Sequence, residues 1–494
     1  MKNRALYISL ITSIVSAFAL VIFASPKTEI ETKPKEGAIR VLFLGHVSEH
    51  HNSNKYYPML AKGLGSDAIY FDYVTSVEEA LGAATFLGKF DALLLYANHG
   101  TITPNQWKNL KDYVEGGGGF VPVHCASWCF GNEPAFDQLV GGRFDSHKVG
   151  TFTSKVVDPQ HPAMEGVKEF EAWDETYKHK NHNEKDRQVL MVREVAGKDD
   201  NITEPEPWTW VRTQGKGRVF YTASGHDERV WKQPAFHQLL KAGILWSVGK
   251  ERKQSYEEFI AERAPLKYEK RGDIANYENR PEPLPYQFPL KAEDSMKYTQ
   301  APVGFRLELF ASEPDIINPI GLAWDERGRL WAAETVDYPN EMTPDRVGND
   351  KIKILEDTDG DGKCDKVTVF ADGLNIPTSL TFSRGGIIVA HVPDFLFLKD
   401  TDGDDKADVR EVLNTGWGTG DTHAGPSNLR YGFDNWIWGA VGYSSYSGTV
   451  GGEQKRFGSG VFRMKPDGSA LEFMHQFNNN TWGCLLYTSD AADE

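Results

Sequence analysis

The sequence predicts a multidomain protein, in which an α/β domain with a mostly parallel sheet precedes an incomplete all-β propeller. Three observations support this prediction. Short apolar runs alternate with helical stretches between Ala38 and Lys250. A strand–turn–strand motif recurs after Gly304. Two nearly identical acidic loops begin at Asp357 and Asp400, 43 residues apart, and a propeller blade repeats every 40–50 residues or so.

Composition limits the class of protein. A chain of 494 residues can form two or three domains with substantial cores. The formal net charge of −16 argues against a nucleic-acid partner, because phosphate binding requires a basic surface.

Residues 1–25 are expected to be a targeting segment. Lys2 and Arg4 precede an apolar run that ends in small residues, as in an export signal. The run is long for a signal peptide, so an uncleaved membrane anchor is the alternative. In either case we expect the rest of the chain to be periplasmic or extracellular.

Residues 37–250 alternate strand and helix patterns. Apolar runs at 39–45, 68–74, 90–96 and 120–124 predict buried parallel strands, and later runs predict strands at 189–193, 208–213 and 218–222. Helices are expected at 105–115 and 235–248. Ligands of such sheets bind at the carboxyl ends of the strands.

The second half is expected to be a linker, at residues 251–300, and a partial propeller, at residues 301–483. The linker is rich in Lys, Glu, Arg and Pro. Three hairpin motifs begin at Gly321, Ser379 and Asn428, and a closed ring needs at least four blades. Residues 484–494 break this pattern, and we interpret them as a non-native tail.

Several polar side chains of the first domain fall at predicted strand ends. Convergence of imidazole, carboxylate and phenol groups at one sheet edge would suit acid–base chemistry or a transition metal. The candidate metal ligands are His46, His51 and His147, and the candidate catalytic residues are His124, Glu175, Tyr177 and His226. The alternative is that each histidine only bonds a backbone carbonyl.

Cys125 follows the fourth predicted strand and suggests a nucleophile on a sharp turn. Its neighbours lack the glycines that such a turn needs, so His124 is the alternative occupant of the turn. A buried, inert thiol is then expected.

The two acidic loops suit calcium, which prefers several oxygen ligands from a flexible loop. The candidate ligands are Asp357, Asp359, Asp361 and Asp365 in the first loop and Asp400, Asp402, Asp404 and Asp408 in the second. Both loops depart from the full calcium-loop pattern, so simple solvated turns are the alternative.

His423 lies in a loop that enters the third hairpin. There it could accept a hydroxyl proton while hydride leaves to a cofactor. Arg430 could bind an anionic group of that cofactor. A structural loop histidine is the alternative.

Residues 46–249 resemble the trehalose-utilisation (ThuA-like) family, which has a class I glutamine-amidotransferase-like fold. The resemblance rests on five motifs: Gly-His with His-His near residues 45–51, Val-His-Cys-Ala-Ser at 123–127, Leu-Val-Gly-Gly-Arg-Phe at 139–144, Trp-Asp-Glu-Thr-Tyr at 173–177, and Gly-Lys-Gly-Arg-Val-Phe-Tyr-Thr followed by Gly-His at 215–226. It implies a role in carbohydrate metabolism.

Residues 304–483 resemble the N-terminal part of a family of membrane-bound dehydrogenase propellers. These are similar to sorbosone and soluble glucose dehydrogenases, which use pyrroloquinoline quinone (PQQ). The resemblance implies that His423 matches the catalytic histidine of that family. The haem-binding Cys-x-x-Cys-His module of longer relatives is absent from this sequence.

Three functional hypotheses follow. The first is an exported carbohydrate-active protein, with a sugar-binding or sugar-transforming domain, a sugar-dehydrogenase-like propeller and an external electron acceptor. The second is a non-catalytic scaffold that binds polysaccharide. The third is a hydrolase or amidotransferase-like enzyme that depends on Cys125.

Overall fold

A computed structural model describes residues 37–196, 200–274, 276, 279–282, 284–339, 342–478 and 480. The chain divides into two compact units, Met1–Arg306 and Leu307–Glu494, and each is described by itself. The predicted targeting segment and non-native tail lie outside the described residues. Within the described ranges, no helix combines the length and apolar character that a membrane crossing requires.

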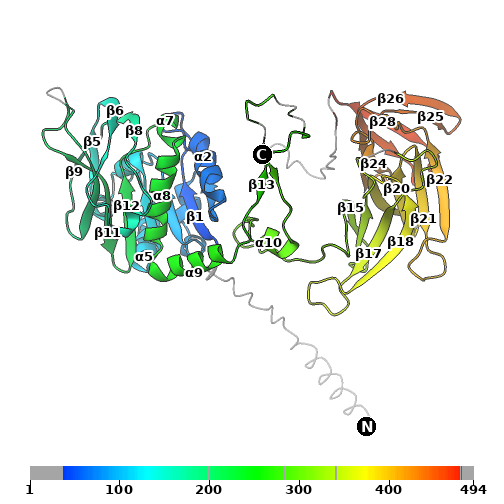
Figure 1. Cartoon of the computed structure of the whole chain (residues 1–494), viewed down its shortest axis with the longest axis horizontal. Coiled ribbons are helices and arrows are strands. Elements are labelled where there is room, and N and C mark those ends of the chain that lie inside the picture. Colours follow the sequence, from blue (N-terminus) through cyan, green and yellow to red (C-terminus); the bar gives the residue numbers. More distant parts are fainter. Residues whose placement is uncertain are drawn as a thin grey trace, which may run out of the picture. The chain divides into compact units, whose positions relative to one another are not determined.

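The first unit is built on an eight-stranded sheet (Figure 1). Five strands are parallel neighbours and three antiparallel strands extend one side. In spatial order they are β2 (Ile69–Val74), β1 (Ile39–Leu44), β3 (Ala92–Leu95), β4 (Gly119–Pro122), β12 (Gly217–Thr222), β11 (Glu206–Gln214), β10 (Arg187–Arg193) and β7 (Lys155–Val156). The predicted mixture of buried parallel strands and a late hairpin is confirmed.

Helices pack against this sheet in two groups. The group that contacts β2, β4 and β12 comprises α2 (Ser53–Gly65), α7 (Glu228–Trp231) and α8 (Pro234–Ser247). The other group comprises α3 (Val77–Leu81), α4 (Ala84–Leu87), α5 (Pro104–Glu115) and α6 (Pro134–Val140). The central strands are buried on both faces, which agrees with a parallel sheet covered by helices.

Local sequence explains where helix α5 begins and ends. Thr103 accepts a hydrogen bond from the Gln106 backbone, and the Gln106 side chain accepts one from the Thr103 backbone. This capping box satisfies two N–H groups at the helix start. Pro104 fits the first turn because it has no N–H to leave unpaired. The helix ends before Gly116.

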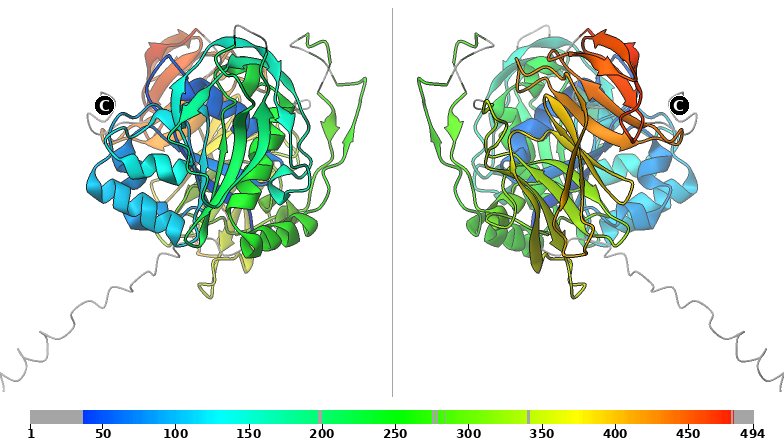
Figure 2. Two further views of the ribbon diagram at one scale, coloured as in Figure 1. Left: turned by 90° about the vertical axis from the view of Figure 1, so that its left-hand side faces the viewer. Right: turned by 90° about the vertical axis from the view of Figure 1, so that its right-hand side faces the viewer.

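Two small antiparallel sheets stand beside the large one. Strand β5 (Arg143–Ser146) pairs with β9 (Lys178–Lys180), and β6 (Val149–Thr153) pairs with β8 (Glu171–Glu175). Short 3₁₀ helices, η1 (His124–Trp128) and η2 (Pro162–Met164), complete the unit. Strands β11 and β12 are seen in green in the left view of Figure 2.

The segment predicted as a linker is more ordered than expected. It contains α9 (Lys250–Ala261), the β13 (Tyr268–Glu269) and β14 (Tyr286–Gln287) hairpin, and α10 (Ala292–Met296). Arg252 forms an ion pair with buried Asp91, and the Tyr256 hydroxyl donates to the Asp67 carbonyl. These contacts attach α9 to the first unit. The apolar residues of α9 follow only a weak helical period, and polar contacts help to hold the helix, so the sequence did not predict it.

The second unit is an antiparallel β region with three four-stranded sheets. The first contains β15 (Pro319–Trp324), β16 (Leu330–Glu334), β17 (Asp350–Glu356) and β18 (Lys366–Leu374). The second contains β19 (Ser379–Ser383), β20 (Gly386–His391), β21 (Asp394–Lys399) and β22 (Val409–Thr415). The third contains β23 (Pro426–Tyr431), β24 (Ile437–Val441), β27 (Gly460–Met464) and β28 (Leu471–Gln476), and β25 (Tyr446–Val450) pairs with β26 (Glu453–Phe457). The three predicted hairpins are confirmed as the first two strands of each sheet.

The first strands of successive sheets contact each other, β15 with β19 and β19 with β23. Apolar side chains fill the space between the sheets. One cluster includes Trp331, Phe370 and Leu380, and another includes Phe395, Trp417 and Phe462. Successive sheets in the sequence are therefore packed side by side.

His391 makes the stability of the second unit depend on pH. Its ring is buried, Nε2 accepts a hydrogen bond from the Asn375 N–H, and Nδ1 has no partner among the described residues. Burial, with a smaller repulsion from Arg410, lowers its pKa to about 4. The unfolded chain binds this proton near pH 6.5 and the folded chain near pH 4. His391 therefore does not reduce the free energy of unfolding above pH 6.5. It lowers that free energy by about 3 kcal/mol as the pH drops to 4.

Denaturant unfolding of the full chain between pH 4 and pH 7 measures this loss. His391→Gln keeps an acceptor for Asn375 and should flatten the pH dependence of the second unit. His475→Gln, at an exposed site, should leave the dependence unchanged. Equal slopes for the His391 variant and the unmodified chain would show that another group is responsible.

Candidate functional site

His124 lies at a sharp turn between β4 and η1. Its φ angle is +49°, in the left-handed region that residues other than glycine rarely adopt. Its Nδ1 lies 2.6 Å from the Ala223 carbonyl oxygen. A carbonyl can only accept, so the proton is on Nδ1 and Nε2 points away from that carbonyl. The structure thus places His124, not Cys125, on the turn.

His51 and His226 each directly precede a helix. Asn52 caps α2 by accepting from the Lys55 N–H, and Asp227 caps α7 by accepting from the Arg229 N–H. The His51 Nδ1 donates to Asn98 Oδ1 at 3.2 Å, which leaves its Nε2 free to face His124. Both histidines are therefore held at the starts of capped helices.

Glu175 ends β8, next to Asp174. The buried Asp174 carboxylate accepts hydrogen bonds from the Gly225 and His226 N–H groups, each at 3.0 Å. This contact joins the end of β8 to the loop that carries His226. Glu175 itself is 4% exposed, so its charge is almost fully removed from water.

These four side chains meet at one point. Their ligand atoms, from His51, His124, Glu175 and His226, all lie within 4.8 Å of one another. The separations are 3.2 Å for His51 Nε2–His124 Nε2, 3.2 Å for His51 Nε2–His226 Nδ1, 3.2 Å for His124 Nε2–Glu175 Oε2, 3.2 Å for His226 Nδ1–Glu175 Oε1 and 3.5 Å for His51 Nε2–Glu175 Oε2. A tetrahedral metal with bonds of roughly 2.0–2.1 Å separates its ligands by about 3.3 Å.

The charges in this group are strongly coupled. Burial lowers the pKa of His51 to about 3, so this imidazole is neutral. Burial alone would raise the pKa of Glu175, but the neighbouring imidazole groups of His124, His226 and His51 outweigh it and hold the pKa well below its usual range. Burial would lower the pKa of His226, but Glu175 raises it above its usual value. The group therefore presents an ionised carboxylate among imidazole nitrogens.

The other three predicted residues surround the group. His46 is not a ligand in this arrangement, because its Nε2 bonds the His51 carbonyl and its Nδ1 accepts from the Asn98 N–H. His147 is exposed, with Nε2 3.6 Å from Glu175 Oε1. Tyr177 stacks on His124, with ring centroids 4.2 Å apart. Burial raises the pKa of Tyr177 well above its usual value, so this phenol stays protonated.

Gly225 allows the loop that carries His226 to pass close behind His124. Its φ is +138°, and a Cβ there would lie 3.2 Å from the His124 Cβ and 3.3 Å from Val123 Cγ1. Gly225→Ala is expected to destabilise the first unit by about 1–3 kcal/mol through backbone strain. Urea unfolding measures this loss. Gly150→Ala, where a Cβ meets nothing within 4 Å, is the control and should unfold as the unmodified chain does.

Cys125 does not have the properties of a nucleophile. Its side chain is fully buried, and burial raises the pKa of the thiol well above its usual value. Nucleophilic cysteines are partly exposed thiolates. The Cys125-dependent hypothesis is therefore disfavoured, and the expected inert thiol agrees with the structure. Among the described residues, Cys129 and Cys364 are also free.

Each acidic loop brings together three of its four predicted ligands. The groups are Asp357, Asp359 and Asp361 in one loop and Asp400, Asp402 and Asp404 in the other. The fourth residue of each loop is used differently. Asp365 accepts hydrogen bonds from Thr358, and Asp408 accepts them from Thr401. In both loops these hydrogen bonds connect the fourth aspartate to the start of the loop.

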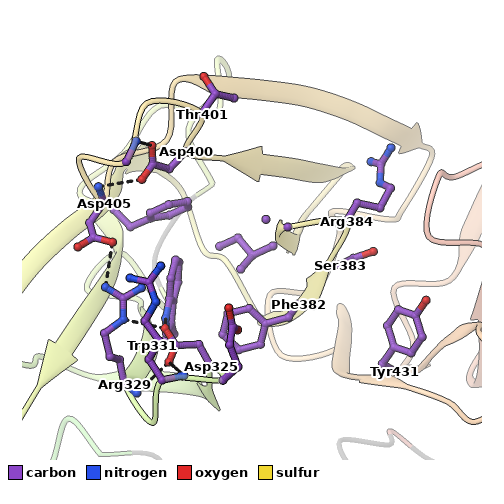
Figure 3. Close-up of a pocket in the computed structure, with 17 residues that line it drawn as sticks. Asp325, Arg329, Trp331, Phe382, Ser383, Arg384, Asp400, Thr401, Asp405 and Tyr431 are labelled. Atoms are coloured by element: carbon purple, nitrogen blue, oxygen red, sulfur yellow. Dashed lines mark hydrogen bonds and ion pairs between the residues drawn. The ribbon is translucent and has the colours of Figure 1, made fainter.

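A cavity of about 710 Å³ in the second unit borders one acidic loop (Figure 3). Arg329, on its wall, bonds Asp325 at 2.7 Å and Asp405 at 2.8 Å. Asp405 occupies the position where a calcium loop usually has glycine, and its φ of +62° is in the left-handed region. Asp405 therefore adopts a strained backbone conformation at this turn. Its ion pair with Arg329 joins the second sheet to the first.

The structure does not bring His423 and Arg430 together. His423 is exposed, before β23, and contacts Asp421 and Tyr338. Arg430 is exposed near the far end of β23. An extended strand rises about 3.3 Å per residue, so the two side chains lie at opposite ends of it. The structure therefore separates the two residues, and their shared role at one cofactor site stays a prediction.

Sequence analysis missed the residues that hold the ligands in place. Asn98, Asp174 and the Ala223 carbonyl fix the rings and loops of the group. The His50 ring lies against the His51 ring, with centroids 3.9 Å apart and the ring planes tilted by 48°. Asp174 lies inside the Trp-Asp-Glu-Thr-Tyr motif, and that position was the only available signal.

The first unit matches a known protein family. Residues 40–247 match the family described as Trehalose utilisation. We call this segment the ThuA-like domain, after the family that it matches. The match associates the ThuA-like domain with a carbohydrate-related function. Residues 291–491 match a domain of unknown function (DUF7133), which leaves the activity of the second unit undefined. A search of curated proteins gave no match.

Solved structures similar to the ThuA-like domain include bacterial proteins of the same description. A ThuA-like protein from Bacteroides uniformis is 20% identical, with TM-score 0.38, covering 43% of this chain and 92% of its own. One from Parabacteroides merdae is 20% identical, with TM-score 0.38, covering 43% and 90%. A β-galactosidase from Bacillus circulans is 14% identical, with TM-score 0.31, covering 43% and 31%.

Proposed function

We propose that the ThuA-like domain is a metal-dependent sugar-binding or sugar-transforming site. The four convergent ligands carry this proposal. His51 and His124 donate their Nδ1 protons away from the group, so their Nε2 atoms face each other at 3.2 Å. At this distance a proton or a metal cation must lie between the two nitrogens, because their lone pairs alone would repel. Ligating histidines typically donate their second N–H to an oxygen acceptor in this way.

The donor set indicates the class of metal. Three imidazole nitrogens and one carboxylate suit zinc or a related divalent transition ion better than calcium. When bound, such an ion would polarise a sugar hydroxyl or carbonyl oxygen as a Lewis acid. His51, His124, Glu175 and His226 would hold this ion. His147 is exposed beside Glu175 and is placed to exchange a proton with the substrate.

The second unit supports a separate proposal. Three four-stranded antiparallel sheets, with contacts between their first strands, suit the blades of a propeller. We propose a dehydrogenase-like propeller whose acidic loops bind calcium. The separation of His423 from Arg430 gives no support to a PQQ site at these two residues. Export, with or without a membrane tether, remains part of the proposal on the sequence of residues 1–25.

Calorimetric titration with sugars tests the proposed function. The full chain would be loaded with Zn²⁺ and titrated with trehalose and a panel of related disaccharides. Binding should require the metal and should disappear in Glu175→Gln, which keeps the shape of the side chain but removes its charge. Equal sugar binding by chelated, metal-free protein would contradict a metal-dependent site.

A further inference from the structure

A chain of four polar side chains runs through the interior of the ThuA-like domain behind His124. The residues are Glu206 on β11, His179 on β9, Tyr221 on β12 and Ser127 on η1. Their exposed fractions are 7%, 3%, 0% and 1%. No substrate can reach groups buried this deeply. Removing polar groups from water is costly unless each group is hydrogen-bonded. Packing alone therefore does not explain why these four residues are buried together.

This series of hydrogen-bonded groups begins at the Glu206 carboxylate and ends at the backbone carbonyl of His124. Glu206 Oε1 accepts from the His179 Nδ1–H at 2.8 Å. The His179 Nε2 lies 3.0 Å from the Tyr221 hydroxyl. That hydroxyl lies 3.0 Å from Ser127 Oγ and 3.1 Å from the His124 carbonyl oxygen. The Ser127 hydroxyl donates to the same carbonyl at 3.1 Å.

We infer that Glu206, His179, Tyr221 and Ser127 are positioning residues, which hold His124 in its strained turn so that Nε2 faces the candidate metal. This inference rests on the proposed metal site. The left-handed backbone of His124 is unfavourable for a residue with a side chain and persists only where its surroundings fix it. The Ser127 hydroxyl on η1 donates to its carbonyl, and the Tyr221 hydroxyl on β12 lies within hydrogen-bond distance of both. The Ala223 carbonyl holds its ring at Nδ1.

Tyr221→Phe tests the inference in the full chain, because it removes one hydroxyl and keeps the ring. Zn²⁺ affinity would be measured by competition with a chelator, and ligand geometry by the visible spectrum of the Co²⁺-loaded protein. Outer hydrogen-bond partners typically contribute 10- to 100-fold to metal affinity. We expect a loss of this size and a shifted Co²⁺ spectrum. Unchanged affinity and spectrum would overturn the inference.

Tyr256→Phe is the matched control. Its hydroxyl is also attached to a buried ring and donates to the Asp67 carbonyl at 2.7 Å, in the contact that attaches α9. It should lose a hydrogen bond without any change in metal affinity or spectrum. If both variants weaken binding equally, general destabilisation explains the effect and the positioning role fails.

Two further measurements distinguish failure of this inference from failure of the proposed function. Ser127→Ala removes the other hydroxyl and should shift the Co²⁺ spectrum if Tyr221→Phe does not fold. Histidine ¹⁵N NMR of the metal-free chain reports the His124 ring directly. Tyr221→Phe should shift the His124 signals and leave those of His237 in place. If the unmodified chain binds no Zn²⁺, the proposed function fails, and unshifted His124 signals would independently overturn the positioning role.

Discussion

His124→Ala is expected to lower the Zn²⁺ affinity of the chain more than 100-fold. Loss of an outer hydrogen-bond partner typically costs 10- to 100-fold, and His124 would contribute a ligand atom directly. Its Nε2 lies 3.2 Å from both His51 Nε2 and Glu175 Oε2, so no other side chain of the group can replace it. Chelator competition with the purified full chain measures the change.

His182→Ala is the control for this experiment. His182 is exposed and accepts a hydrogen bond from Arg187 through its Nδ1, outside the four-ligand group. Its loss should change Zn²⁺ affinity less than twofold. Equal affinities for His124→Ala and the unmodified chain would place the metal elsewhere.

Arg329→Met is expected to destabilise the second unit by about 3–5 kcal/mol. The Arg329 guanidinium is largely buried and pairs with Asp325 and Asp405. Removing one partner of a buried ion pair leaves an uncompensated charge, which costs about this much free energy. Lys366 still pairs with Glu356 and lies 3.9 Å from Asp405, so the loss falls mainly on the buried Asp325 side chain. Thermal unfolding of the full chain measures it.

Arg384→Met is the matched variant, because Arg384 lines the same cavity and is exposed (Figure 3). Its guanidinium stacks on Phe397 at 4.0 Å, and no ion pair involves it within the described part of the chain. We expect a change below about 1 kcal/mol, as is usual for exposed charges. Similar losses for both variants would argue against a sheet-joining role for Arg329.

The elements with a strong hydrophobic period were predictable. Strands β3 and β4 are uninterrupted apolar runs, and β1 and β2 are interrupted only by Arg40 and Asp72, because both faces of a parallel sheet are largely buried. Helix α9 was missed because its apolar contacts, from Tyr256, Phe259 and Ile260, are few, and an ion pair and a tyrosine hydrogen bond also attach it. Periodicity detects apolar burial and carries no information on polar anchoring.

The candidate site was predictable as a set of residues but not as a geometry. Strand-end positions pointed to His51, His124 and His226, since carboxyl ends of parallel strands meet at one edge. Glu175 was found by its motif, and it ends β8, an antiparallel strand of a small sheet. Spacing could not separate these ligands from His46, whose two ring nitrogens bond the backbone. Ring orientation depends on second partners such as Asn98, and these come from distant parts of the chain.

Anomalous X-ray diffraction at the zinc absorption edge, from crystals of the full chain grown with Zn²⁺, tests the central claim most directly. We predict one strong peak in the ThuA-like domain, within bonding distance of His51 Nε2, His124 Nε2, His226 Nδ1 and a Glu175 oxygen. An absent peak between these atoms at saturating Zn²⁺ would contradict the metal-dependent site.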